Sequence, residues 1–143
     1  MSEFDLSLNN VSRQLNIFDC CRKKIIHPYF PYLKESKIIE SSLSVTNVEL
    51  YRKRFNELLE NSIEGKISIY SCSVDEEAID MSNFGGLFSC HLLYYATGNE
   101  NLSVYKAFKK VEPIVQELSS HRQNPVIHKP RMKGYTFPFY LGP

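Results

Sequence analysis

The sequence predicts a mainly α fold of four to five helices with a small β element, and the alternative is α+β with a minor antiparallel sheet. Three observations lead to this expectation. Apolar residues recur at helical spacing in several segments, one segment alternates clearly, and prolines and glycines interrupt residues 122–143. The length of 143 residues fits a single globular domain that spans residues 1–143.

The first expected helix lies within residues 9–25, with Asn9 or Asn10 as its cap. Pro28 and Pro31 would end it and force an extended connection. Its apolar stripe runs through Val11, Leu15, Phe18, Cys21 or Arg22, and Ile25.

The second expected helix is the clearest one and covers residues 46–64, with Gly65 as its stop. Its apolar stripe consists of Val48, Tyr51, Phe55, Leu58 and Leu59. Residues 66–74 alternate between apolar and polar side chains, which predicts one strand. This strand needs a partner, which residues 36–45 or the tail would supply.

The acidic residues from Asp75 to Asp80 are expected at the start of a third helix, which leads into residues 82–98. A fourth helix is expected over residues 99–121, kinked or split at Pro113. In the tail, residues 126–128 and 135–141 would form short extended or edge-strand pieces.

Ser89, Cys90 and His91 stand side by side in an apolar run, which raises the question of a catalytic cysteine. Neighbours on a helix point about 100° apart, so Cys90 and His91 cannot form a dyad with each other. The apolar surroundings would raise the pKa of the Cys90 thiol. We therefore expect a buried structural helix. A cysteine-dependent hydrolase or transferase centred on Cys90, with a base from His27, His121 or His128, is one alternative.

The cysteines Cys20, Cys21, Cys72 and Cys90 show no CxxC spacing, so reduced and mostly buried thiols are expected, with no metal and no cofactor. No segment resembles a signal peptide or a membrane span, which indicates a cytoplasmic protein that does not contact a membrane. The net charge of +1 provides no global attraction to nucleic acid.

Because catalytic motifs are missing, we expect a non-enzymatic protein that binds another protein. An inhibitor or toxin-immunity protein that acts by steric occlusion of a toxin or enzyme is the leading hypothesis. The alternative is nucleic-acid binding through the basic and aromatic tail. The expected partner-binding residues are an acidic and a basic-aromatic group: Asp75, Glu76, Glu77, Asp80, Arg122, Lys129, Arg131, Lys133 and Tyr135.

Overall fold

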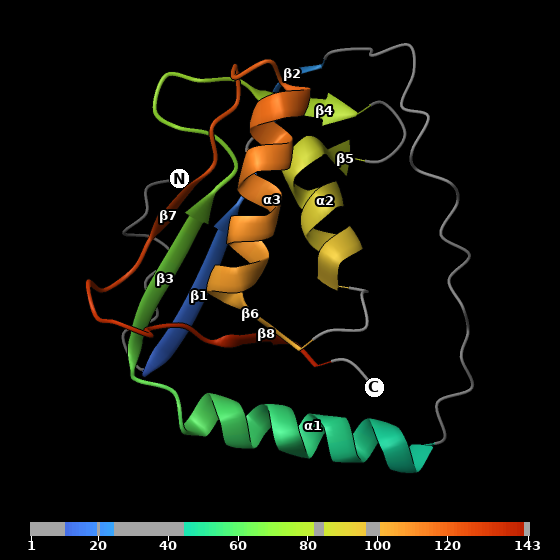
Figure 1. Ribbon diagram of the computed structural model, residues 1–143, viewed down its shortest axis with the longest axis vertical. Helices are drawn as coiled ribbons and strands as arrows, with labels where there is room; N and C mark the ends of the chain where they lie inside the picture. The colour runs from blue at the N-terminus through green and yellow to red at the C-terminus, as the bar shows by residue number, and fades with distance from the viewer. Residues whose placement is uncertain (1–10, 20, 25–44, 82–84, 97–100, 142–143) are drawn as a thin grey trace.

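A computed structural model of the protein describes residues 11–19, 21–24, 45–81, 85–96 and 101–141. The elements in chain order are β1 (Arg13–Phe18), β2 (Cys21–Lys24), α1 (Val45–Glu60), β3 (Gly65–Tyr70), β4 (Ala78–Met81), β5 (Gly85–Gly86), α2 (Leu87–Ala96), β6 (Leu102–Ser103), α3 (Val104–Leu118), β7 (Val126–His128) and β8 (Pro138–Tyr140). Figure 1 shows their arrangement.

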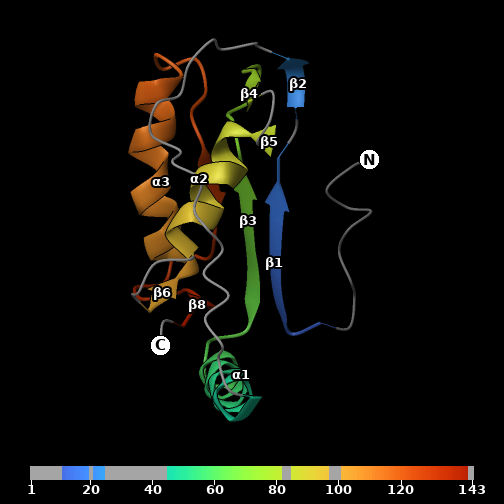
Figure 2. The same cartoon turned by 90° about the vertical axis from the view of Figure 1, so that its right-hand side faces the viewer.

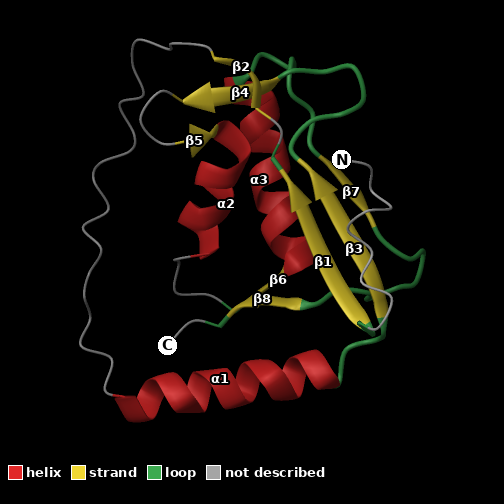
Figure 3. Ribbon diagram, turned by 180° about the vertical axis from the view of Figure 1, so that it is seen from behind, coloured by secondary structure: helices red, strands yellow, loops and turns green. Residues whose placement is uncertain are grey.

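Three small sheets organise these elements. The main sheet has the order β1-β3-β7, in which β1 and β3 are parallel and β7 is antiparallel to β3. The second sheet, of order β2-β4-β5, lies beyond the arrowheads of β1 and β3 (Figures 1 and 3). In the third sheet, β6 pairs with β8. The chain therefore continues from each parallel strand of the main sheet into a strand of the second sheet.

The predicted fold class is wrong, because parallel strands linked through a helix define an α/β fold rather than a mainly α one or a minor antiparallel sheet. β1 pairs with β3 in parallel and β2 with β4 in parallel, and α1 lies in the chain between the members of each pair. Parallel strands need a long crossover, and the helical segment supplies part of it. The fold class rests on pairing partners that lie about 50 residues apart, which a local pattern does not reveal.

The helix expected within residues 9–25 is replaced by β1 and β2 over its described part. Leu15 and Ile17 alternate with polar residues, and they pair with Ile67 and Ile69 of β3. Apolar residues spaced by four fit one face of a helix and also one face of a strand, so the short pattern is ambiguous. Parallel pairing with β3 decides between the two. The expected caps Asn9 and Asn10 lie outside the described residues.

The helix expected from Asp75 onward is also wrong in its first part, where β4 forms. Ala78, Ile79 and Met81 are buried there. The helix begins only at Leu87, after Gly85, whose φ of +80° turns the chain in a way that suits glycine. The acids therefore lie in a loop and a strand rather than in a first helical turn.

The other expected helices and strands are confirmed. α1 and β3 match the predicted second helix and the predicted strand, and α3 matches the fourth helix and continues through Pro113 without splitting. The tail provides the short strands β7 and β8. The proposed partner strand in residues 36–44 lies outside the described residues, so only the tail and β1 are seen to pair with β3.

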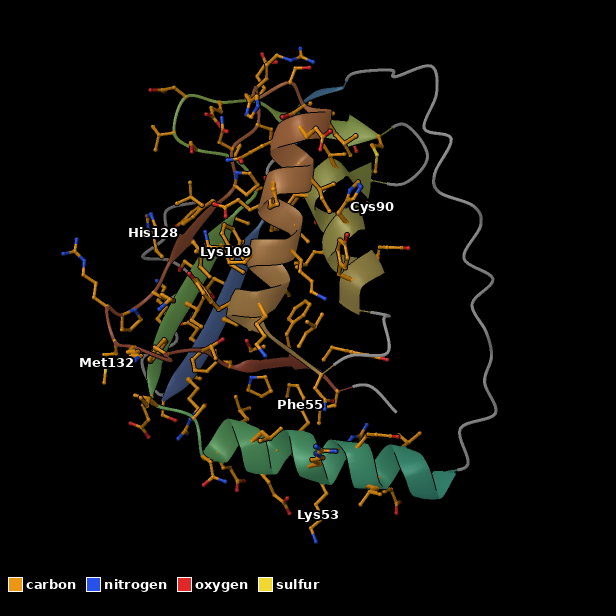
Figure 4. The ribbon with its side chains drawn as sticks, viewed as in Figure 1. Lys53, Phe55, Cys90, Lys109, His128 and Met132 are labelled. Atoms are coloured by element: carbon orange, nitrogen blue, oxygen red, sulfur yellow. The ribbon has the colours of Figure 1, made fainter. Side chains whose placement is uncertain are left out.

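Helices α2 and α3 cover one face of the main sheet, and the core lies between them and the strands (Figure 2). α3 buries a stripe that includes Phe108, Val111 and Val115, as its spacing predicts. The buried apolar residues from the other elements are Ile67, Ile69, Ala78, Ile79, Met81, Leu87, Phe88, Leu92, Leu102, Tyr135 and Phe137. α1 lies apart from these layers, across one end of the molecule, where Phe55 points toward the body and Lys53 away from it (Figure 4).

Candidate functional site

The carboxyl ends of β1 and β3 lie side by side and are joined tightly. The Ser71 N–H donates a hydrogen bond of 2.9 Å to the Phe18 carbonyl oxygen. The rings of Phe18 and Tyr70 stack with their centroids 4.9 Å apart and an interplanar angle of 13°. Just beyond this point Cys21 begins β2 and pairs with Ala78 of β4. The backbone of Cys21 is therefore placed where the main sheet passes into the second sheet.

Asp19, which directly follows β1, lies against the N-terminus of α2. Its Oδ2 accepts hydrogen bonds from the Ser89 hydroxyl and, at 3.3 Å, from the Ser89 N–H. Gly86 faces the same carboxylate, since a Cβ on Gly86 would lie only 2.8 Å from the Asp19 carboxyl carbon. The helix N-terminus carries partial positive charge and unpaired N–H groups, which stabilise a carboxylate. Asp19 therefore caps α2 from a distant segment.

Among the residues that the structure describes, two buried carboxylate oxygens beside Gly86 have no hydrogen-bond partner. They are Oδ1 of Asp19 and Oδ1 of Asp80. Asp80 is the strand partner of Gly86, so both acids border the same glycine. The sequence predicted Asp80 as part of a surface patch, and the structure places it on β4 with a half-buried side chain.

The loop that follows β3 is held by Glu76. One carboxylate oxygen accepts hydrogen bonds from the Asn124 N–H at 2.7 Å and the Ser73 N–H at 3.1 Å, and the other accepts from the Asn124 side-chain amide at 2.7 Å. Burial raises the pKa of Glu76, but these hydrogen bonds from Asn124 and Ser73 outweigh it, so its pKa is lowered. Glu76 therefore joins the loop to the segment after α3.

Gln123 supports the same loop from inside, and its side chain is fully buried. Its amide Nε2 donates to the Ser71 carbonyl at 2.8 Å, and its Oε1 accepts from the Ile79 N–H at 2.9 Å. The Gln123 amide thus connects the Ser71 carbonyl, directly after β3, to the Ile79 N–H of β4. The loop between these strands is anchored at both of its ends, which keeps the carboxyl end of β3 in place.

The two cysteines whose side chains the structure describes, Cys72 and Cys90, are free thiols with different surroundings. The Cys72 thiol donates to the Glu76 carbonyl oxygen at 3.6 Å. Cys90 packs against the core from α2 (Figure 4), and burial raises the pKa of its thiol, as the sequence predicted. The expectation that Cys90 is buried holds only in part, because its side chain is half-buried.

The stretch Ser89-Cys90-His91 forms no catalytic dyad in the described structure. His91 Nδ1 hydrogen-bonds the Leu87 carbonyl oxygen of its own helix at 2.9 Å. The Ser89 hydroxyl is directed to Asp19. Cys90 is therefore flanked by side chains that are engaged elsewhere, as the helical geometry predicted.

The predicted partner-binding residues differ in their exposure. Asp75, Glu77, Arg122, Arg131 and Lys133 are exposed, whereas the Glu76 carboxylate is bonded to Asn124. The Lys129 ammonium lies 5.2 Å from the centroid of the Tyr105 ring. Tyr135 is 2% exposed and packs against Phe137, so its ring belongs to the core. Their role in binding a partner stays a prediction.

In the part of the chain that the structure describes, no three His, Cys, Asp or Glu side chains come together in a way that would hold a metal ion. Within the same residues, no helix combines the length and the apolar character that a membrane crossing requires.

The fold and this site define an α/β protein in which a cysteine follows a parallel strand. The model of one family, the caspase domain, matches residues 2–136, and the chain belongs to that family. No curated protein and no solved structure matches the chain. The match overturns the leading hypothesis of an inhibitor or toxin-immunity protein, because caspase domains are characteristic of cysteine-dependent hydrolases.

The family match directs attention to the cysteines that follow β1, which the sequence analysis does not single out. The caspase signature is Gln-Ala-Cys followed by Arg, Gln or Gly and then Gly. When residues 19–23 (Asp-Cys-Cys-Arg-Lys) are set beside this signature, the cysteine and the arginine agree and the other three residues depart. The sequence pattern that could have indicated this cysteine site is a pair of cysteines followed by arginine, directly after a segment of alternating apolar and polar residues. The helix that the spacing predicts within residues 9–25 conceals this pattern.

Proposed function

We propose that this protein carries the cysteine site of a caspase-type peptidase, with Cys21 as the nucleophile. The observation that supports it best is the position of Cys21, immediately beyond the carboxyl end of β1 in a parallel pair. Ligands of open α/β sheets bind outside the carboxyl ends of the strands, so a substrate would approach at this place. The arginine that follows Cys21 fits the signature.

The other described cysteines are poorer nucleophiles. The Cys90 thiol has a raised pKa because it is buried, so less of it is thiolate at neutral pH. The Cys72 thiol is directed to a carbonyl oxygen, and serine rather than arginine follows it. Cys21 is therefore the cysteine that both its place in the fold and its sequence neighbours favour.

The proposed reaction is the two-step hydrolysis of a peptide bond. The Cys21 thiolate would add to the carbonyl carbon, the amine would leave with a proton from the general acid, and water would then cleave the thioester. The signature has its histidine about 50 residues upstream of the cysteine. Here His27, His91, His121 and His128 all follow Cys21. The base must come from one of these four or from residues outside this sequence.

The test measures both reactivity and turnover. The native protein is treated with iodoacetamide at neutral pH, and labelling of each cysteine is followed by peptide mapping with fragment-ion assignment. Cleavage of unfolded casein is then measured for C21A and for two matched controls, C72A and C90A. We expect Cys21 to label fastest and C21A to lose cleavage, while both controls retain it. Cleavage that survives in C21A, or preferential labelling of Cys72 or Cys90, contradicts the proposal.

A further inference from the structure

Asp19 stands two positions before Cys21 and is the last described residue before it. Its carboxylate is not directed to solvent but to the first turn of α2, where the hydroxyl and the N–H of Ser89 both donate to one oxygen. These groups lie 70 positions further along the chain. The contact therefore joins the end of β1 to helix α2, which follows both α1 and β3 in the sequence.

Gly86 and Ser89, at the N-terminus of α2, surround the Asp19 carboxylate. Gly86 precedes α2, and a Cβ at this position would lie 2.8 and 2.9 Å from the carboxyl carbon and Oδ1 of Asp19. A real Cβ atom does not approach that closely, so with alanine at position 86 the Asp19 carboxylate would have to shift from this place. Gly86 and Ser89 both lie beside the Asp19 carboxylate at the N-terminus of α2. The partial charge there stabilises the anion.

The same glycine links this contact to the strand pairing of Cys21. Gly86 pairs with Asp80 of β4, and Ala78 of the same strand pairs with Cys21. The backbone of Cys21 pairs with Ala78, and two positions earlier the Asp19 carboxylate is held by Ser89. Between them lies only Cys20.

We propose that Asp19 is a positioning residue of the cysteine site, whose carboxylate fastens the end of β1 to the N-terminus of α2 and so fixes the backbone that presents Cys21. This inference rests on the proposed function, in which Cys21 is the nucleophile. A nucleophile must be held within a fraction of an ångström of its attack geometry, and a shift of about 1 Å can lower the rate about 100-fold. A strand end tied at a single point would not provide that constraint.

Four variants test the anchor. D19A removes the carboxylate, S89A removes the hydroxyl donor, and G86A fills the space that the carboxylate occupies. D19N is the conservative variant, because its amide oxygen can still accept from Ser89 and its shape is unchanged. The matched control is S103A, which removes the corresponding cap of α3, where the Ser103 hydroxyl oxygen accepts from the Lys106 N–H.

The first readout is the rate of iodoacetamide labelling at Cys21, with Cys90 in the same molecule as a gauge of general loosening. We expect D19A, S89A and G86A each to change the rate of Cys21 labelling about tenfold, because the thiolate fraction and the accessibility of Cys21 depend on where its backbone is held, while Cys90 labelling stays as in the wild type. D19N and S103A should label Cys21 as the wild type does. The second readout is casein cleavage, for which we expect kcat to fall and KM to stay unchanged in the first three variants.

The outcomes separate the two proposals. A wild-type Cys21 that labels no faster than a free cysteine contradicts the proposed function and this inference together. A reactive wild-type Cys21 whose labelling is unchanged in D19A and S89A refutes the anchor alone. Cys90 labelling that rises together with the change at Cys21 also refutes it, since Asp19 would then serve only stability. If D19A does not fold, S89A and G86A carry the test.

Discussion

Single residues hold this molecule together where distant segments meet, and Glu76 and Gln123 are the clearest cases. Glu76 binds three donors from two segments, and Gln123 pairs with backbone groups on both sides of the loop after β3. Gln123 is fully buried, and a buried polar group without its partners costs about 1–3 kcal/mol, so its side chain must find these partners for the loop to close. In the sequence alone, Glu76 is one of several neighbouring acids and Gln123 is an ordinary polar residue.

The lowered pKa of Glu76 predicts an acid dependence of stability. Because the folded-state pKa lies below the ordinary value of 4.5, the ionised carboxylate stabilises the fold above that pH. This contribution is lost as the pH falls from 4.5 through the folded-state pKa. We expect E76Q to be less stable than the wild type at pH 7 and the gap to narrow at acid pH. Urea unfolding of both proteins at a series of pH values measures this difference in the free energy of unfolding.

The control for this prediction is E117Q, on the exposed side of α3. It removes one carboxylate from an exposed position of the same protein. A gap between E76Q and the wild type that stays the same down to pH 3 would show that shape, not charge, is what matters at this position.

At the level of elements, patterns of period 3.6 located α1 and α3 well but misassigned β1 and β2. The spacing predicts one apolar face with Val104 or Tyr105, Phe108, Val111, Val115 and Leu118. α3 buries Val104, Phe108, Val111 and Val115, whereas Leu118 at its end is 38% exposed. In β1, Leu15 and Ile17 instead alternate and pair with Ile67 and Ile69. A six-residue strand is too short for its period to be separated from that of a helix, so the pairing partner decides. The cysteine motif was missed for the same reason.

Helix α2 offers a matched test of packing. Leu92 is 4% exposed and belongs to the core, whereas its neighbour Leu93 is 65% exposed. We expect L92A to lower the free energy of unfolding by about 2–5 kcal/mol, because it leaves a cavity between α2 and α3. L93A should change it by only about 0.5 kcal/mol. Urea unfolding of the two variants compares them directly, and equal losses would contradict the described orientation of α2.

At the scale of the whole molecule, the two helices on the sheet and the outlying α1 should differ in local stability. α1 exposes Leu50 to 64%, Val48 to 45% and Leu58 to 44%, and it packs mainly on the short strand β8. α3 buries a complete stripe in the core. Segments with little buried apolar surface open locally at lower cost than the core does.

We therefore expect backbone amides of α1 to exchange with deuterium faster than those of α3 under native conditions. Hydrogen exchange with mass spectrometry compares peptides that cover Val48–Leu59 with peptides that cover Val104–Leu118. Similar protection in both helices would show that α1 is covered by more than β8.

Local patterns in the sequence were sufficient for α1, β3, α2 from Leu87, α3 and the short tail strands, since each depends on side-chain periodicity and on glycine or proline within a few residues. They were also sufficient to predict that Cys90 and His91 do not form a catalytic dyad with each other. Only the tertiary structure decided the α/β class, the strands β1, β2 and β4, and the setting of Cys21. These features depend on parallel pairing across about 50 residues and on contacts such as Asp19 with Ser89, 70 positions apart. Such pairings leave no mark in a short window, because any apolar strand can satisfy the hydrogen bonds of another.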